Sequence, residues 1–151
     1  MDQFLKSYCW DNLDSTYVAS LLAGDGATIN AQLARLANRG DWLALHALLR
    51  SLNREALIGD LPVLVSYWHG KLALATDSPQ TARRWLAFAV AESPDHVQAW
   101  IDLALADRLA GEWLSAAESL RCALRLHPNN VQVRVELARV SLATGDAPLA
   151  L

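Results

Sequence analysis

The chain has 151 residues and is short of several features that would point directly to a function. Its 2 cysteines are too few for a disulfide framework or a cysteine-bound metal cluster. Its longest uninterrupted apolar run covers residues 85–91, whereas a helix that crosses a bilayer needs about 20 apolar residues. The first residues lack the basic and then apolar stretch of a signal peptide. We therefore expect a cytoplasmic protein that does not insert into membranes.

The chain also lacks an excess of charge of one sign, since 13 Lys and Arg stand against 16 Asp and Glu for a net charge of −3. A basic surface that attracts nucleic acid is therefore not expected. Apolar residues are abundant instead, at 53% of the chain, and Ala and Leu alone supply 54 residues. Both are among the strongest helix formers, so the composition predicts one all-helical domain.

An internal repeat organises the second half of the chain. Pro94 and Pro128 lie 34 residues apart, and small and branched apolar residues around them recur with the same step. Such positions are those at which a repeated packing interface constrains side-chain size. The recurring pairs include Ala82 and Ala116, Leu86 and Leu120, Ala89 and Ala123, Leu103 and Leu137, and Gly111 and Gly145.

The spacing of apolar residues and the turn signals divide the chain into helix pairs. Gly111 tolerates a positive φ and ends one helix, Pro128 stops the next, and Asn130 can cap the one after it. Asp146 and Pro148 open a further helix at the end of the chain. The expected helices cover residues 14–22, 27–39, 42–52, 61–76, 78–92, 97–110, 114–126 and 130–144.

These residues resemble tetratricopeptide repeats (TPR), a family of 34-residue helix–turn–helix units with spaced Trp, Gly, Ala and Pro positions. The resemblance implies an all-α, right-handed superhelical solenoid of antiparallel helix pairs, with about 8–9 helices in this chain. The unit before the best one departs from the family pattern, with Ser66 for the early aromatic and Asp77 for the turn glycine. The best unit carries Trp100, Leu103, Ala104, Gly111, Glu112, Trp113, Ala116, Leu120, Ala123 and Pro128 at matching places.

The resemblance also suggests how the chain is divided. Gly40-Asp41-Trp42 matches the turn at Gly111-Glu112-Trp113, but the two turns lie 71 residues apart, three more than two periods. We assign the excess to the break around Gly59 and Pro62. The predicted parts are an N-terminal capping segment at 1–26, a degenerate helix pair and linker at 27–62, and TPR-like repeats at 63–151, divided into 63–96, 97–130 and an incomplete 131–151.

No catalytic, cofactor-binding or metal-binding motif stands out, and we expect this chain by itself not to be an enzyme. Gly24-Asp25-Gly26 lacks the spacing and the following lysine of a phosphate-binding loop. His46, His69, His96 and His127 are far apart, and none is followed three or four residues later by a second metal-ligand type. We interpret His96 and His127 as solvated turn residues.

Other conspicuous residues have structural explanations. Cys122 is expected to be a small buried hydrophobic residue, and Arg83 and Arg84 to lie on a solvated helix face. Three of the 6 tryptophans occupy packing positions of the repeat and are expected in the core, whereas Trp10, Trp68 and Trp85 are less constrained by it. The three predicted core tryptophans are Trp42, Trp100 and Trp113.

The resemblance places a partner-binding groove along the first helix of each unit. Tyr67, Ile101 and Val135 stand where the lysine and asparagine clamp for chaperone tails would be needed, so that specialised function is disfavoured. The mixture of apolar and basic residues favours a protein or peptide partner with apolar and acidic side chains. The predicted groove residues are Tyr67, Trp68, Lys71, Gln98, Ile101, Asp102, Leu105, Arg108, Gln132, Val135, Glu136 and Arg139.

The leading hypothesis is therefore a protein–protein interaction scaffold, and two alternatives stay open. The chain could be the N-terminal repeat region of a larger bacterial enzyme, similar to glycosyltransferases or sulfotransferases that carry such arrays. It could also self-assemble into a homo-oligomer, with its C-terminal end stacking on another copy through Val133, Val140 and Leu149.

Overall fold

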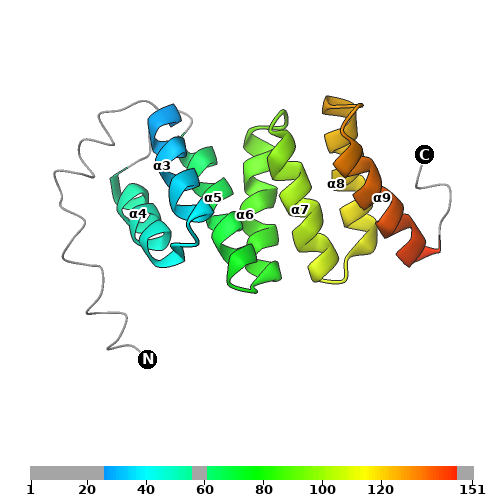
Figure 1. Ribbon diagram of the computed structural model, residues 1–151, viewed down its shortest axis with the longest axis horizontal. Helices are drawn as coiled ribbons and strands as arrows, with labels where there is room; N and C mark the ends of the chain where they lie inside the picture. The colour runs from blue at the N-terminus through cyan, green and yellow to red at the C-terminus, as the bar shows by residue number, and fades with distance from the viewer. Residues whose placement is uncertain (1–25, 56–60, 146–151) are drawn as a thin grey trace.

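The computed structural model describes residues 26–55 and 61–145, and in these ranges the chain forms seven helices and no strand (Figure 1). The predicted all-helical class is therefore confirmed. Eight or nine helices were expected for the whole chain, and the expected segments at 14–22 and beyond 146 lie outside the described residues. The helices are α3 (Gly26–Asn38), α4 (Trp42–Glu55), α5 (Leu61–Ala75), α6 (Pro79–Glu92), α7 (Val97–Leu109), α8 (Trp113–Leu126) and α9 (Val131–Thr144).

The helices stand in one row, from α3 and α4 at one end to α9 at the other (Figure 1). Each helix packs against the next one along the chain, and α5 also contacts α3 on one side and α7 on the other. The short connections make consecutive helices antiparallel. The first helices of successive pairs therefore run in the same direction, and α5 is in direct contact with both α3 and α7.

The turns inside the helix pairs share a left-handed backbone residue. Gly111, between α7 and α8, has φ +82°, as its predicted helix-ending role requires. Asp77 lies 34 residues earlier, where the repeat pattern calls for glycine, and has φ +56°. The α5–α6 turn therefore keeps the same backbone conformation without the glycine, at some cost in steric strain.

Side chains also fix where the helices begin. Asn130 Oδ1 accepts a hydrogen bond from the Val133 backbone N–H (3.2 Å) and caps α9 as predicted. His96 Nδ1 accepts one from the Ala99 backbone N–H (3.1 Å) and caps α7 in the same way. The interpretation of His96 as a solvated turn residue was wrong, because its ring is partly buried and occupied as a helix cap.

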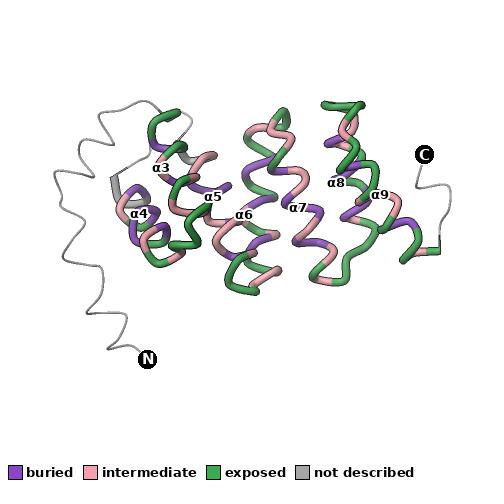
Figure 2. Tube along the Cα trace, in the orientation of Figure 1, coloured by how far each residue is buried: buried purple, intermediate pink, exposed green. Residues whose placement is uncertain are grey.

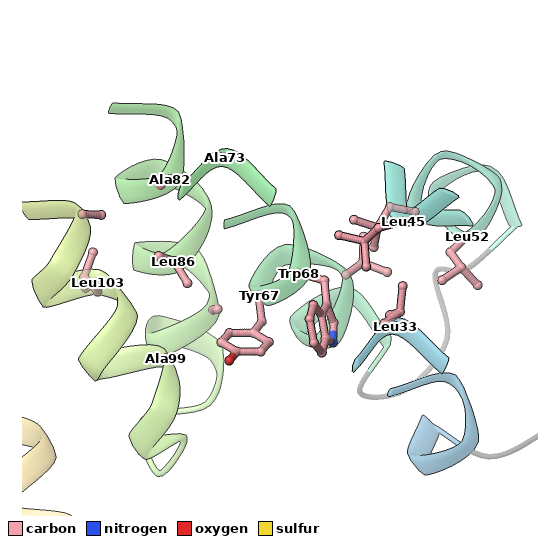
Figure 3. Close-up of a cluster of buried hydrophobic side chains, with 14 of the residues drawn as sticks. Leu33, Leu45, Leu52, Tyr67, Trp68, Ala73, Ala82, Leu86, Ala99 and Leu103 are labelled. Carbon is pink, nitrogen blue, oxygen red and sulfur yellow. The ribbon is translucent and has the colours of Figure 1, made fainter. Parts of the chain in front are cut away.

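Buried residues recur in every helix of the row (Figure 2), and the apolar ones form two clusters. The larger one runs from α3 to α7, with Leu33 and Leu86 fully enclosed, and Figure 3 shows part of it. The smaller one joins α7, α8 and α9 around Leu120. Helix α7 belongs to both, because Leu103 faces the first cluster and Ala104 the second. This helix therefore links the two halves of the array.

Helices α5 and α6 approach each other closely at Gly70. A Cβ atom built on Gly70 would overlap the Cγ atom of Leu86, which is itself fully buried. A side chain at this position would force the helices apart. Gly70 therefore permits the close approach of the paired helices α5 and α6.

Candidate partner-binding surface

The twelve predicted groove residues lie on the first helices of three successive units: three on α5, five on α7 and four on α9. The 34-residue step makes Tyr67, Ile101 and Val135 equivalent positions of equivalent helices. Equivalent residues of stacked repeats lie on the same face of the array. We call this face the first-helix surface and examine which of its residues are free to meet a partner.

Asp102 of α7 brings α5 and α7 together. Its carboxylate is buried, and it accepts hydrogen bonds from the Tyr67 hydroxyl (3.0 Å) and from Gln98 Nε2 (3.2 Å). Lys71 Nζ lies 3.3 Å from Asp102 Oδ2 and forms an ion pair with it. A buried carboxylate is tolerable when such donors replace the lost water. Burial, together with the negative charge of Asp102, raises the pKa of Tyr67 far above its ordinary value of 10.0.

The Tyr67 and Trp68 side chains point toward two different neighbouring helices, and both make contacts inside the protein. Tyr67 lies toward α7 and Trp68 toward α3 (Figure 3). The Trp68 Nε1–H donates to Asn30 Oδ1 (2.8 Å), and the Tyr67 ring packs 4.7 Å from the ring of His96. The two residues are only 7% and 6% exposed, so they offer little surface as apolar anchors and instead support the first-helix surface.

The apolar residues that remain accessible lie further along the row. Ile101 and Leu105 of α7 are partly exposed, and Val135 of α9 is exposed. Leu109 and Leu142 are also exposed. Periodicity finds the apolar side of a helix but does not show which part of that side a neighbouring helix covers.

The charged residues of the first-helix surface differ in their availability. Arg139 NH1 donates to Glu136 Oε1 (2.8 Å) on the same helix, and the arginine side chain is largely exposed. Lys71 is partly exposed but already paired with Asp102. Arg108 is partly exposed, and within the residues that the structure describes it forms no ion pair. Gln98 and Gln132 are exposed and occupy equivalent positions on α7 and α9.

Arg83 departs from its predicted place on a solvated helix face. Its Nε donates to the buried Asp107 carboxylate over 2.6 Å and joins α6 to α7. Burial raises the pKa of Asp107 above its ordinary value, although the Arg83 guanidinium acts in the opposite direction. Arg84, in contrast, is exposed as predicted.

His69 is partly buried between α5 and α6, where its ring stacks on Trp85 with 4.6 Å between centroids. Its Nε2 atom is buried without a hydrogen-bond partner. Burial lowers the pKa of His69, and the nearby His46 lowers it further.

In the described ranges, no three His, Cys, Asp or Glu side chains are grouped to hold a metal ion. None of the helices in those ranges combines the length and apolar character needed to cross a membrane.

Three further predictions about single residues can be compared with the structure. Trp42 and Trp100 pack against the core clusters, as predicted, but Trp113 at the start of α8 is exposed, so its assignment to the core was wrong. Cys122 is only partly buried and accepts a hydrogen bond from Arg125 (2.9 Å). His127 is exposed in the turn before α9, as predicted.

Two of the three residues predicted to mediate self-assembly are not available for it. Val133 and Val140 are fully buried in the cluster that joins α8 and α9. They do not form a free end of the array, because they lie on the side of α9 that faces the rest of the protein. Leu149 lies outside the described residues.

The sequence matches no protein-family model and no curated protein. Solved structures do match. MamA from Desulfovibrio magneticus RS-1, from residue 41 to its end, aligns over 83% of this chain and 70% of its own length, with 21% identity and a TM-score of 0.69. An ArsTM double mutant of RS-1 MamA gives the same identity and TM-score, with 69% of its chain covered.

A third match is the C-terminal TPR-containing domain of an FK506-binding-type protein from Plasmodium falciparum. It covers 95% of this chain and 98% of that domain, with 15% identity and a TM-score of 0.67. Similarity at such low identity is similarity of fold. Together with the helix pairs, the 34-residue step and the left-handed turn residues, it shows that this chain has a TPR-like fold.

Proposed function

We propose that this chain is a protein–protein interaction scaffold that holds a protein or peptide partner against its first-helix surface. The observation that carries the proposal is that Leu105 and Val135 are apolar, lie on this surface and remain partly or largely exposed, with Ile101 beside them partly exposed and packed on the smaller core cluster. Apolar side chains left open beside polar ones are typical of binding surfaces. The other described helices then act as a rigid support, and the chain is not itself an enzyme.

The shape and the polar groups of this surface favour an elongated partner. In a right-handed superhelix of such pairs, α5, α7 and α9 line the concave side. Gln98 and Gln132 are exposed there, and an amide side chain can both donate to and accept from a peptide backbone. Their separation by one repeat suits a peptide that runs across the helices rather than along one of them.

The charges of the surface favour acidic groups on the partner. Arg108 is free of ion pairs among the described residues, and Arg139 is exposed despite its bond to Glu136. Both can bind a carboxylate with two parallel hydrogen bonds. Lys71 contributes less, since Asp102 already neutralises it. A cytoplasmic partner with apolar and acidic side chains fits these residues best.

Site-specific photocrosslinking tests the proposal. A photoreactive phenylalanine analogue at Leu105 should form a crosslinked adduct with the partner in cells of the source organism. The matched control carries the same analogue at Phe88, an exposed apolar residue on the second helix α6. An adduct from position 105 that is absent from position 88 supports the proposal. Equal adducts from both positions, or none from position 105, contradict it.

A further inference from the structure

Leu105, Arg108 and Leu109 form an open patch on one side of α7. They follow one another at intervals of 3 and 1 residues, which places them together on the helix surface. Leu109 is 50% exposed, and Leu105 and Arg108 are partly exposed. Within the described ranges Arg108 forms no ion pair. We call these three residues the α7 patch.

The α7 patch is exposed with both neighbouring units present. Helix α7 packs against α6 before it and α8 after it, and α5 contacts it from the preceding unit. The first helix of the next unit, α9, is also described, and α7 stands inside the row rather than at its end (Figure 1). The sides of α7 that serve the array are occupied, since Leu103 and Ala104 are buried in the two core clusters. The patch is therefore not a surface left for a further helix of the array.

Residues 2–14 lie outside the described residues, and their sequence has the chemistry that complements the α7 patch. They hold three aspartates against one lysine, together with the aromatic residues Phe4, Tyr8 and Trp10. Trp10 is followed directly by Asp11, so an apolar and an acidic side chain adjoin, as an apolar and a basic one do in the patch. Tryptophan is a frequent anchor of binding surfaces, and a carboxylate can accept two hydrogen bonds from one arginine.

The chain is long enough to bring this segment to the α7 patch. Helix α3 contacts α5, and α5 contacts α7, so at about 10 Å for each packed pair α7 lies about 20 Å from α3. Residues 15–25 join the segment to the start of α3, and 11 extended residues span up to about 36 Å. They still span about 22 Å if the predicted helix at 14–22 forms. The first helices run in the same direction, so the segment arrives at the start of α7 and can run along it towards Leu109.

We propose that residues 2–14 bind to the first-helix surface of their own chain as an internal ligand, with Trp10 on the two leucines of the α7 patch and Asp11 paired with Arg108. A partner must then displace this segment, which makes partner binding weaker. That regulatory step rests on the proposed function, whereas the internal contact does not. Residues 146–151 fit less well, because the 34-residue step makes them equivalent to the start of the second helix α8.

Photocrosslinking of the purified full chain tests the internal contact. A photoreactive phenylalanine analogue at Leu105 should crosslink within one molecule to a site in residues 2–14, which mass spectrometry of the digested protein locates. The matched control carries the analogue at Phe88, exposed on the second helix α6, and should give no such crosslink. Trypsin leaves both positions on one peptide, residues 85–108, so the two samples are compared directly.

Exchange of the two charges supplies the decisive comparison. Asp11→Lys or Arg108→Glu alone should lower the crosslink yield about threefold or more, because an attractive pair becomes a repulsive one. The double variant should restore the yield, which damage to the fold would not do. The matched control Glu118→Lys makes the same change of net charge as Asp11→Lys at an exposed residue of α8 and should leave the yield unchanged.

Several results would overturn the inference: no crosslink from Leu105 to residues 2–14, an equal crosslink from Phe88, or single reversals that the double variant does not rescue. A crosslinked species of dimer mass would make the segment of a second copy the occupant and also overturn it. A crosslink to residues 146–151 in place of 2–14 would do the same.

The outcomes separate this inference from the proposed function. Loss of the internal crosslink, with a persistent partner crosslink from Leu105 in cells, removes only the internal contact. An internal crosslink without any partner crosslink removes the proposed function instead. Where both crosslinks form, Asp11→Lys should raise the yield of the partner crosslink about threefold, since the segment no longer competes as strongly. An unchanged yield would overturn the regulatory step.

Discussion

Lys71 of α5 and Asp102 of α7 form an ion pair across the junction between two helix pairs, with 3.3 Å between Nζ and Oδ2. The aspartate side chain is 6% exposed and the lysine side chain 30%. The carboxylate is thus enclosed by the protein, while the ammonium group lies at its edge. This pair and the Tyr67 hydrogen bond join two neighbouring first helices, and the Gln98 hydrogen bond within α7 also holds the carboxylate.

The first prediction concerns this ion pair. Lys71→Met removes the charged donor and leaves a buried carboxylate with neutral donors only, so the free energy of unfolding should fall by about 1–3 kcal/mol. Arg139→Met breaks the exposed pair with Glu136 and should cost less than about 0.5 kcal/mol. Urea denaturation measures both. A Lys71→Met variant no less stable than Arg139→Met would show that the buried pair does not hold the junction.

The second prediction concerns the contact between Gly70 and Leu86. Gly70→Ala should lower the free energy of unfolding by about 1–3 kcal/mol, because the new methyl group overlaps Leu86 Cγ. In a Leu86→Ala background the same change should cost much less, since the space is then free. Denaturation of the four proteins in this cycle gives the coupling. Strict additivity would contradict the close approach.

The third prediction concerns the strained turn at Asp77. Asp77→Gly should raise the free energy of unfolding by about 0.5–1 kcal/mol, because glycine adopts the left-handed conformation without steric cost. The reciprocal change Gly111→Ala, at φ +82°, should lower it. Thermal denaturation reports both changes, and a destabilising Asp77→Gly would be evidence against the strain.

The fourth prediction concerns pH. The pKa of His69 is lowered from its ordinary value of 6.5, so the folded protein favours the neutral imidazole. Its stabilising contribution is complete above pH 6.5 and is lost as the pH falls below that value through the folded pKa. His69→Gln should therefore flatten the fall of the unfolding free energy as the pH drops below about 6.5. The exposed His127→Gln is the control, and a curve unchanged by His69→Gln would contradict the lowered pKa.

The positions of the helices were largely predictable because they follow from local causes. Gly111 ends α7 in the left-handed conformation and Asn130 caps α9, and both roles depend on residues a few positions away. The regular 34-residue step then repeats the same pattern of helix-ending and helix-capping residues in the next unit. The predicted and observed helix ends accordingly differ by only a few residues.

The polar contacts between helices were not predictable in this way. Asp102 was placed on an open groove because its position in the repeat is a groove position, but Tyr67, 35 residues earlier, covers it. Arg83 likewise pairs with Asp107, 24 residues away. A single sequence shows the faces of the helices but not which charges neutralise each other across a junction. The groove residues could therefore be assigned to helices, but the sequence could not show which of them are free to contact a partner.

The most direct test of the central claim is the affinity of the crosslinked partner for two matched variants. Leu105→Glu places a charge on the first-helix surface, and Phe88→Glu places the same charge on the second helix α6. Isothermal titration calorimetry should show binding weakened by about tenfold or more for Leu105→Glu and unchanged for Phe88→Glu. Unchanged binding to a folded Leu105→Glu variant, or an equal loss for both, would contradict the claim that partners bind along the first helices.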